Sequence, residues 1–450
     1  MMLPTRIAAP IAALIALLMG ASCQPDRFSS NPSLRLGFSA DTVMFDTVFC
    51  TVGTATKTLK IYNRSSAHLR IDRVQLRGGA GSPYSVNLDG IDGHSFSDIA
   101  LRAYDSLFLF VRLSAPPTAQ DTPLCVADSL LFITNGNRQQ VQLLAWGQDV
   151  ALHRNAQLNA DTALRAGRPH LVYGTMTVEA GARLTLEAGA RLHFHPRASL
   201  VVRGALLAEG TAEAPVVLTG DRLEPYYRDK AGQWGGIHLQ PGSTASLRWA
   251  RVRNCITALR ADALADTLRL SHCRMERCSH ACLLANGTSV VADNCLFANG
   301  ANACVSLLGG EHRLSHCTVA CYWSGFSFRG GAALQLHHPD TLPMVRALFE
   351  NCIVYGTRPN EVEATPPSAP YLFRCCLLRT SFDTSDARMA SIALDDPKFI
   401  NTAKLNLELD TLSPAIGRAC PAVAQRYPID LNGNPRLDDG WPDIGAFERQ

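Results

Sequence analysis

The sequence predicts an all-β protein in which a β-sandwich is followed by a parallel β-helix. Three observations support this prediction: short alternating strands in the first third, strand-plus-turn repeats after residue 170, and cysteines spaced 22 residues apart. Apolar residues at every second position are typical of half-buried strands. Repetition at a fixed period indicates a solenoid. The chain is therefore expected to hold two domains with different strand patterns.

Residues 1–22 have the pattern of a secretory signal peptide. A basic residue precedes the apolar run 7–19, and small residues lead to Cys23. The run is shorter than the roughly 20 apolar residues that span a membrane. Small residues before a cysteine resemble the lipobox of bacterial lipoproteins, so Cys23 is expected to be acylated and residues 23–32 to tether the lipid anchor. Gly20 stands where Leu is usual, which leaves ordinary secretory cleavage as the alternative.

The composition is that of a globular exported chain. The 42 basic residues nearly balance the 39 acidic ones, so no basic face for nucleic acid is expected. After removal of the leader the chain is long enough for two domains.

Residues 33–150 are predicted to form the sandwich. The segment 58–62, Thr-Leu-Lys-Ile-Tyr, alternates in period two, and Asn135-Gly136 between two apolar runs is a strong hairpin signal. Cys50 and Cys125 are candidates for a disulfide in an oxidising compartment. The alternative is that they are two buried small residues.

Residues 151–169 are predicted to be a linker and residues 170–450 a β-helix with a C-terminal end segment. Segments 174–181 and 182–189 repeat a short strand followed by a glycine turn. A coil of about 22 residues places equivalent positions roughly 4.8 Å apart along the axis.

The cysteines of the second region are predicted to form a structural ladder inside the coils. The ladder members are Cys255, Cys273, Cys295, Cys317, Cys352 and Cys375. Small apolar thiols suit a narrow interior better than a metal site, which needs four converging ligands. No metal site is predicted, and disulfides between neighbouring coils stay open as an alternative. The Asn or His before most of these cysteines is expected at a sharp corner in the left-handed region.

These segments resemble right-handed β-helix repeat proteins of Gram-negative cell surfaces. The resemblance rests on residues 181–210, Gln233-Trp-Gly-Gly-Ile-His-Leu239, the Asn-Cys coils and the closing segments 430–436 and 442–448. Residues 41–49 look like the immunoglobulin-like module that precedes the helix in one lipoprotein subgroup. The resemblance implies a pectate-lyase-like superfold with a right-handed, single-stranded parallel β-helix. It also implies that the segment from Asp430 orders the end of the solenoid.

No catalytic residues are assigned. Asp395-Asp396 and Asp438-Asp439 are predicted to be turns, because Asp beside Gly or Pro is ordinary turn chemistry. Ligand-facing loops are the better candidates, since loops on a rigid scaffold carry function. The residues chosen on this basis are Tyr226, Tyr227, Trp234, His337 and His338.

The resulting hypothesis is a non-catalytic lipoprotein of the cell envelope that presents its β-helix to a glycan or a partner. It is expected at the outer membrane, on the cell surface or the periplasmic side, with a polysaccharide or a surface protein as partner and no nucleic acid. The alternative is a polysaccharide lyase or glycoside hydrolase built on the same scaffold. No cofactor is expected, and Ca²⁺ would enter only if the lyase alternative held.

Overall fold

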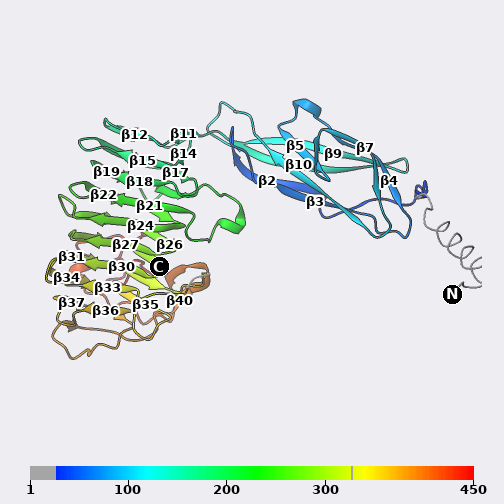
Figure 1. Ribbon diagram of the computed structural model, residues 1–450. Helices are drawn as coiled ribbons and strands as arrows, with labels where there is room; N and C mark the ends of the chain where they lie inside the picture. Colours follow the sequence, from blue (N-terminus) through cyan, green and yellow to red (C-terminus); the bar gives the residue numbers. More distant parts are fainter. Residues whose placement is uncertain (1–26, 326–327) are drawn as a thin grey trace, which may run out of the picture. The chain divides into compact units, whose positions relative to one another are not determined.

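The computed structural model describes residues 27–325 and 328–450 (Figure 1). The described chain divides into two compact units, one ending at Gln148 and the other made of Ala119–Thr122 with Asp149–Gln450. The predicted signal peptide and Cys23 lie outside the described residues. Within the described ranges, no helix is long and apolar enough to cross a membrane.

The first unit is a β-sandwich of two five-stranded sheets. One sheet has the order β1-β3-β8-β5-β6 and the other the order β2-β10-β9-β4-β7. The strands are β1 (Gly37–Phe38), β2 (Thr42–Phe49), β3 (Lys57–Tyr62), β4 (Leu69–Leu76), β5 (Tyr84–Leu88), β6 (Ile91–Gly93), β7 (Ser95–Leu101), β8 (Ser106–Leu113), β9 (Leu124–Thr134) and β10 (Asn137–Gln148), with a 3₁₀ helix η1 (Gly79–Gly81) after β4. Leu109, Val111 and Leu113 of β8 are buried in the core, as alternation requires when one face of a strand is covered.

The predicted hairpin is confirmed. Strands β9 and β10 pair antiparallel from Thr134 and Asn137 onward, and the two residues between them, Asn135 and Gly136, both have positive φ. That backbone matches the twist of the flanking strands.

Cys50 and Cys125 are not joined in the structure. Cys50 is buried in the sandwich core, whereas Cys125 in β9 is an exposed free thiol. The predicted bridge between them therefore stays a prediction.

The second unit is a parallel β-helix with three long parallel sheets (Figure 1). Sheet 1 contains β11 (Ala151–Arg154), β14 (His170–Tyr173), β17 (Arg191–Phe194), β20 (Val216–Gly220), β23 (Ala250–Arg253), β26 (Arg274–Cys278), β29 (Leu296–Gly300), β32 (Thr318–Cys321), β35 (Ile353–Gly356) and β38 (Leu377–Leu378). Sheet 2 contains β12 (Gln157–Leu158), β15 (Thr175–Val178), β18 (Ser199–Val202), β21 (Trp234–Leu239), β24 (Cys255–Asp262), β27 (Ala281–Asn286), β30 (Ala303–Leu308), β33 (Leu334–His337) and β36 (Val362–Thr365). Sheet 3 contains β13 (Thr162–Leu164), β16 (Arg183–Glu187), β19 (Ala205–Glu209), β22 (Thr244–Arg248), β25 (Leu268–Ser271), β28 (Val290–Asp293), β31 (Gly310–Ser315), β34 (Met344–Glu350), β37 (Tyr371–Arg374) and β39 (Met389–Ala390). Each coil thus passes once through sheets 1, 2 and 3 before the next coil begins.

The β-helix begins earlier than predicted. Strands β11, β12 and β13 pair in parallel with β14, β15 and β16, so residues 151–164 form the first coil. The prediction of a linker over 151–169 was wrong, because these strands continue the hydrogen-bond ladder of the next coil.

From β22 onward, one corner recurs where sheet 3 passes to sheet 1 of the next coil, and we call it the return corner. Its residues all have positive φ: Trp249, His272, Asn294, His316, Asn351 and Cys375. The predicted corner role of the Asn and His residues is confirmed. Cys375 occupies this corner too, so the interior ladder continues through its neighbour Cys376, which is fully buried. The assignment of Cys375 to the ladder was wrong by one residue.

Two separate columns of thiols fill the interior. The column behind the return corner contains Cys273, Cys295, Cys317, Cys352 and Cys376, and the second contains Cys255, Cys278, Cys282, Cys304 and Cys321. Cys255 was predicted in the first column. It instead follows Asn254 at the corner between sheets 1 and 2, where its sulfur lies 3.7 Å from that of Cys278.

Residues 391–450, which we call the tail, fold back onto the outer face of sheet 1. They contain β40 (Phe399–Asn401), η3 (Thr402–Lys404), β41 (Asn406–Leu409) and α2 (Pro421–Ala424). Tail residues such as Phe447 pack with Leu296 and Ile353 of sheet 1 in one apolar cluster. The tail thus covers a flank of the coils, and it was expected only to order their end.

Candidate functional site

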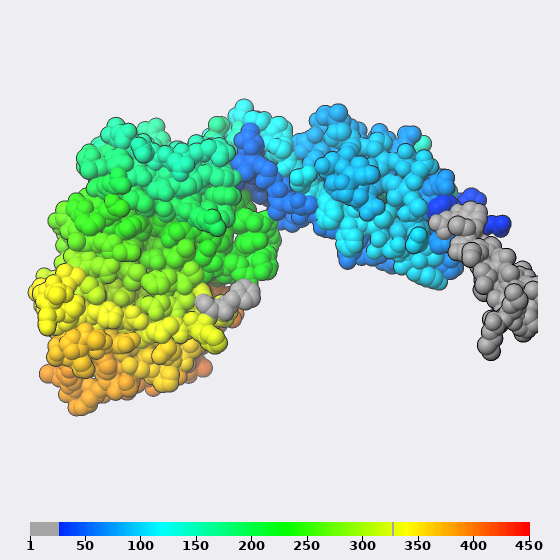
Figure 2. Space-filling view, viewed as in Figure 1, coloured from blue at the N-terminus to red at the C-terminus, as the bar shows by residue number. Residues whose placement is uncertain are grey.

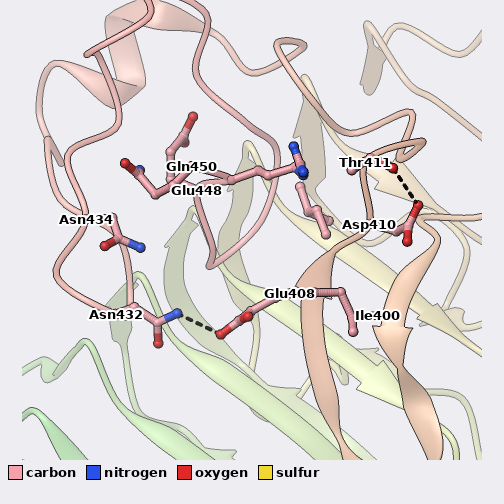
Figure 3. Close-up of a pocket in the computed structure, with 10 residues that line it drawn as sticks. Ile400, Glu408, Asp410, Thr411, Asn432, Asn434, Glu448 and Gln450 are labelled. Atoms are coloured by element: carbon pink, nitrogen blue, oxygen red, sulfur yellow. Dashed lines mark hydrogen bonds between the residues drawn. The ribbon is translucent and has the colours of Figure 1, made fainter.

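A cavity of about 420 Å³ lies within the tail (Figure 3). Glu408, Asp410 and Glu448 are among its lining residues, and Glu408 accepts a hydrogen bond from the Asn432 amide (2.9 Å). Burial raises the pKa of Glu448 to about 8, against the attraction of Arg436 at 3.2 Å. Glu448 also accepts the backbone N–H of Asp443, so this carboxyl belongs to the buried contacts that dock the tail.

A larger cavity of about 620 Å³ lies at the corner where coils pass from sheet 1 to sheet 2. We call it the corner pocket. The loop 221–233, which inserts between β20 and β21 and projects from the flank of the β-helix in Figure 2, forms one wall. Residues of the coils, including Arg277 and Asn299, Trp323 from the next insertion, and Leu405 of the tail complete the lining.

Two adjacent tyrosines dominate the loop wall. Tyr226 and Tyr227 end the 3₁₀ helix η2 (Pro225–Tyr227) and meet edge to face at 5.0 Å between ring centroids. The side chain of Tyr226 is 65% exposed. The Lys230 ammonium lies 4.8 Å from the Tyr226 ring centroid, and the Arg222 guanidinium lies 4.0 Å from that of Tyr227. Each of these cation–π contacts favours the observed ring position by about 0.5–1 kcal/mol at an exposed site.

The loop is held against the coils by side-chain amides. The Gln233 amide donates to the carbonyls of Tyr227 (2.6 Å) and Lys230 (2.8 Å). The Asn254 amide donates to the carbonyls of Arg228 (3.0 Å) and Lys230 (2.8 Å). Asn254 is nearly fully buried at its corner, so it positions the loop and does not itself face a ligand.

Charged residues beside the pocket form a connected group. Arg277 contacts Asp229 at 2.9 Å and Glu276 at 3.0 Å, and Arg253 approaches the same two carboxylates at 3.9 and 3.7 Å. Burial lowers the pKa of the Arg253 guanidinium, and the negative charge of Glu276 opposes that change. Each carboxylate is thus paired with arginine. In each carboxylate the arginine contacts fall on one oxygen, Oδ1 of Asp229 and Oε1 of Glu276.

The predicted ligand-facing residues do not all lie at the corner pocket. Tyr226 and Tyr227 do line the corner pocket. Trp234 does not, because its side chain is fully buried inside the coils, stacks on Phe194 at 4.1 Å and donates its indole N–H to a backbone carbonyl.

The predicted histidines also lie elsewhere. His337 ends β33 in sheet 2, and the ring of the adjacent His338 accepts the backbone N–H of Met344 at 2.8 Å. Neither residue lines the corner pocket, and the His338 contact closes the turn between sheets 2 and 3. The assignment of Trp234 as a ligand-facing residue was therefore wrong, whereas that of the partly exposed His337 and His338 stays a prediction.

Sequence reasoning missed Arg277, Asn299 and Trp323 as pocket residues. The signal that could have identified two of them is the coil period, because Arg277 and Asn299 both have positive φ at successive coils of the same corner. Within residues 27–325 and 328–450, no group of three or more His, Cys, Asp or Glu side chains could hold a metal ion.

Comparison with known proteins gives one match of sequence family. Residues 156–247, from β12 to β22, match the pectate-lyase-like β-helix domain. The match supports a pectate-lyase-like fold for the β-helix and suggests a carbohydrate-related role for that domain. A search of curated proteins found no match.

Solved structures show only slight likeness. A protein of unknown function from Porphyromonas gingivalis W83 is 12% identical, with 28% of this chain and 50% of that chain covered and a TM-score of 0.20. The PapD-like domain 7 of human CEP192 is 11% identical, with 29% and 95% covered and a TM-score of 0.18. A family 123 glycoside hydrolase from Clostridium perfringens, described as hydrolysing glycolipid glycans, is 8% identical, with 29% and 30% covered and a TM-score of 0.20. The chain spans half of the first of these structures, and likenesses of this size carry no functional argument.

Proposed function

We propose that this protein binds a glycan without cleaving it, in the corner pocket of its β-helix. The observation that carries the proposal is the pair of tyrosines held at the mouth of a cavity of about 620 Å³. That volume lies within the range of small-ligand sites. Tyrosine offers an apolar ring face for the C–H side of a sugar and a hydroxyl for its polar edge.

The charged group beside the tyrosines suits a ligand rich in hydroxyls. Arg277 and Asp229 supply N–H donors and carboxylate acceptors at the pocket wall, and a sugar hydroxyl can use both. The same contacts favour binding over chemistry. A glycosidase needs two carboxyl groups held across one sugar bond, whereas Asp229 and Glu276 share the same arginines.

We further propose that the protein works in the cell envelope, anchored at the outer membrane by lipid on Cys23. The support is the leader of residues 1–22 and the small residues before Cys23. Palmitate labelling of the full chain tests this anchor. Label in the wild-type protein that is lost in Cys23→Ala supports it, and an unlabelled wild-type protein contradicts it.

Glycan binding is tested with a glycan array followed by calorimetry on the best ligand. Tyr226→Ala is expected to weaken binding by about tenfold or more, the usual effect of removing a central aromatic contact. Tyr226→Phe should retain most of the affinity because it keeps the ring. Tyr104→Ala is the matched control, since Tyr104 is a 75% exposed tyrosine of the sandwich.

The same ligands decide between binding and catalysis. Reducing-sugar release and absorbance from unsaturated uronides are measured over a polysaccharide panel. Binding without turnover supports the proposal. Turnover by the wild type that is lost in Asp229→Asn would show that the protein is an enzyme and would contradict the proposal. A wild-type protein that binds no glycan would also contradict it.

A further inference from the structure

Two thiols outside the interior columns meet where the tail crosses the return corner. Cys375 is the return-corner residue between β37 and β38, with φ of 51°. Cys420 is the tail residue directly before α2. Both side chains are partly exposed, whereas the ten interior cysteines are fully buried.

The backbone of Cys420 is fixed one coil away from Cys375. The Asn351 side chain accepts the N–H of Cys420 (2.8 Å) and donates to its carbonyl oxygen (3.1 Å). Asn351 and Cys375 are stacked neighbours in the return corner, because Glu350 pairs with Arg374 and Ile353 with Leu377 in adjacent strands. Stacked positions lie about 4.8 Å apart, so Cys375 is the immediate neighbour of the residue whose side chain holds the Cys420 backbone.

The two thiols already interact. Partial burial and the adjacent Cys420 thiol, which hydrogen-bonds with Cys375, raise the pKa of Cys375 to about 11. The hydrogen bond between the two thiols shows that the sulfurs face each other.

We propose that Cys375 and Cys420 form a disulfide that fastens the tail to the β-helix. One thiolate attacks a donor disulfide, such as that of a dithiol oxidoreductase or oxidised glutathione, and forms a mixed disulfide with release of one donor thiol. The second thiolate then displaces the other donor thiol. Two protons leave the cysteines, and the donor disulfide is reduced to two thiols.

The bond would join residues 45 positions apart and close the tail over sheet 1. Oxidation is expected at this pair of cysteines because a donor disulfide must be able to reach the attacking thiol. The interior columns are sealed from such donors, even though Cys255 and Cys278 lie at 3.7 Å.

The test uses the full chain, incubated with oxidised glutathione, blocked with an alkylating agent and digested for mass spectrometry without reduction. The expected product is a single linked peptide pair containing Cys375 and Cys420, with the ten interior thiols alkylated only after denaturation. Cys125→Ser, which removes an exposed thiol of the sandwich, should leave the link unchanged. Native protein in which both Cys375 and Cys420 remain fully alkylated overturns the proposal, as does a link between any other pair.

Protease cleavage of the tail gives a second measurement. The oxidised wild-type protein is expected to lose its tail at least tenfold more slowly than Cys420→Ser or than the wild type treated with dithiothreitol. Equal rates in all three samples overturn the proposed fastening. Glycan binding is not used as a readout, so failure of this proposal and failure of the proposed function are distinguishable.

Discussion

Arg436→Met is expected to release the tail from the β-helix. The Arg436 side chain is fully buried and carries two hydrogen bonds to the Asn294 side-chain oxygen (2.8 and 3.2 Å), one to the Gly445 carbonyl (3.1 Å) and one to Glu448 (3.2 Å). Asn294 is a return-corner residue of the coils, so this one guanidinium joins the tail to them.

The magnitude follows from burial. Removing the guanidinium leaves the buried Asn294 oxygen and Gly445 carbonyl without this donor, which costs about 1–3 kcal/mol for each group. Since about 1.4 kcal/mol is a factor of ten, a total loss of about 2–6 kcal/mol should make opening of the tail roughly 30-fold to 10⁴-fold more frequent. The double variant Arg436→Met/Glu448→Gln should recover part of the loss, because it removes the unpaired carboxyl as well.

Native-state hydrogen exchange measured by mass spectrometry checks this prediction. Peptides from residues 396–450 should exchange faster in Arg436→Met, while peptides from residues 183–209 in the early coils serve as the internal control. Unchanged exchange of the tail peptides would refute the reasoning, as would equal acceleration of tail and coil peptides. Because Leu405 lines the corner pocket, the variant should also bind glycan more weakly.

Three further outcomes are expected. Trp234→Ala should lower the free energy of unfolding of the second unit by about 3–5 kcal/mol in chemical denaturation, because it removes a fully buried ring that stacks on Phe194. A loss below 1 kcal/mol would contradict this packing. Gly236→Ala should prevent correct folding, measured as loss of soluble protein, because its Cβ would lie 1.6 Å from the Thr257 carbonyl oxygen at φ of +105°. Burial raises the pKa of Glu448 from 4.5 to about 8, so the folded state keeps a proton that the unfolded state releases. That contribution to stability is complete below pH 4.5 and is lost as the pH rises to 8. Denaturation at pH 5 and pH 8 should therefore show a larger decrease for the wild type than for Glu448→Gln, and equal decreases would contradict the shift.

The coils were predictable because their order is local and periodic. The 22-residue spacing of Cys273, Cys295 and Cys317 repeats the same environment in each turn. The spacing does not locate a position more closely than one residue. Cys375 and Cys376 are adjacent, and spacing alone does not distinguish the corner position from the interior one.

The docking of the tail was not predictable from such a pattern. Its key contact joins Asn294 and Arg436 across 142 positions of sequence, and no periodicity connects them. The first coil, residues 151–164, was missed for a related reason. Its strands are short, and only their pairing with the following coil identifies them.

The candidate site was predicted in part. Tyr226 and Tyr227 were found because an aromatic-rich insertion interrupts the coil period. Trp234 was misplaced because strands alternate inward and outward positions, and a tryptophan at the start of a strand fits either face by composition alone. Arg277 and Asn299 were missed although they lie one coil period apart, because the period alone does not show which corner faces the pocket.

The tail also makes the protein sensitive to truncation. The last strand of the coils ends at Ala390, so the outer face of sheet 1 has no cover until the tail has docked. A chain cut short before residue 396 would leave Leu296, Ile353 and their apolar neighbours open to water. Exposed apolar surface of this kind promotes aggregation and recognition by chaperones and proteases. Burial of the outer face of sheet 1 therefore requires the tail.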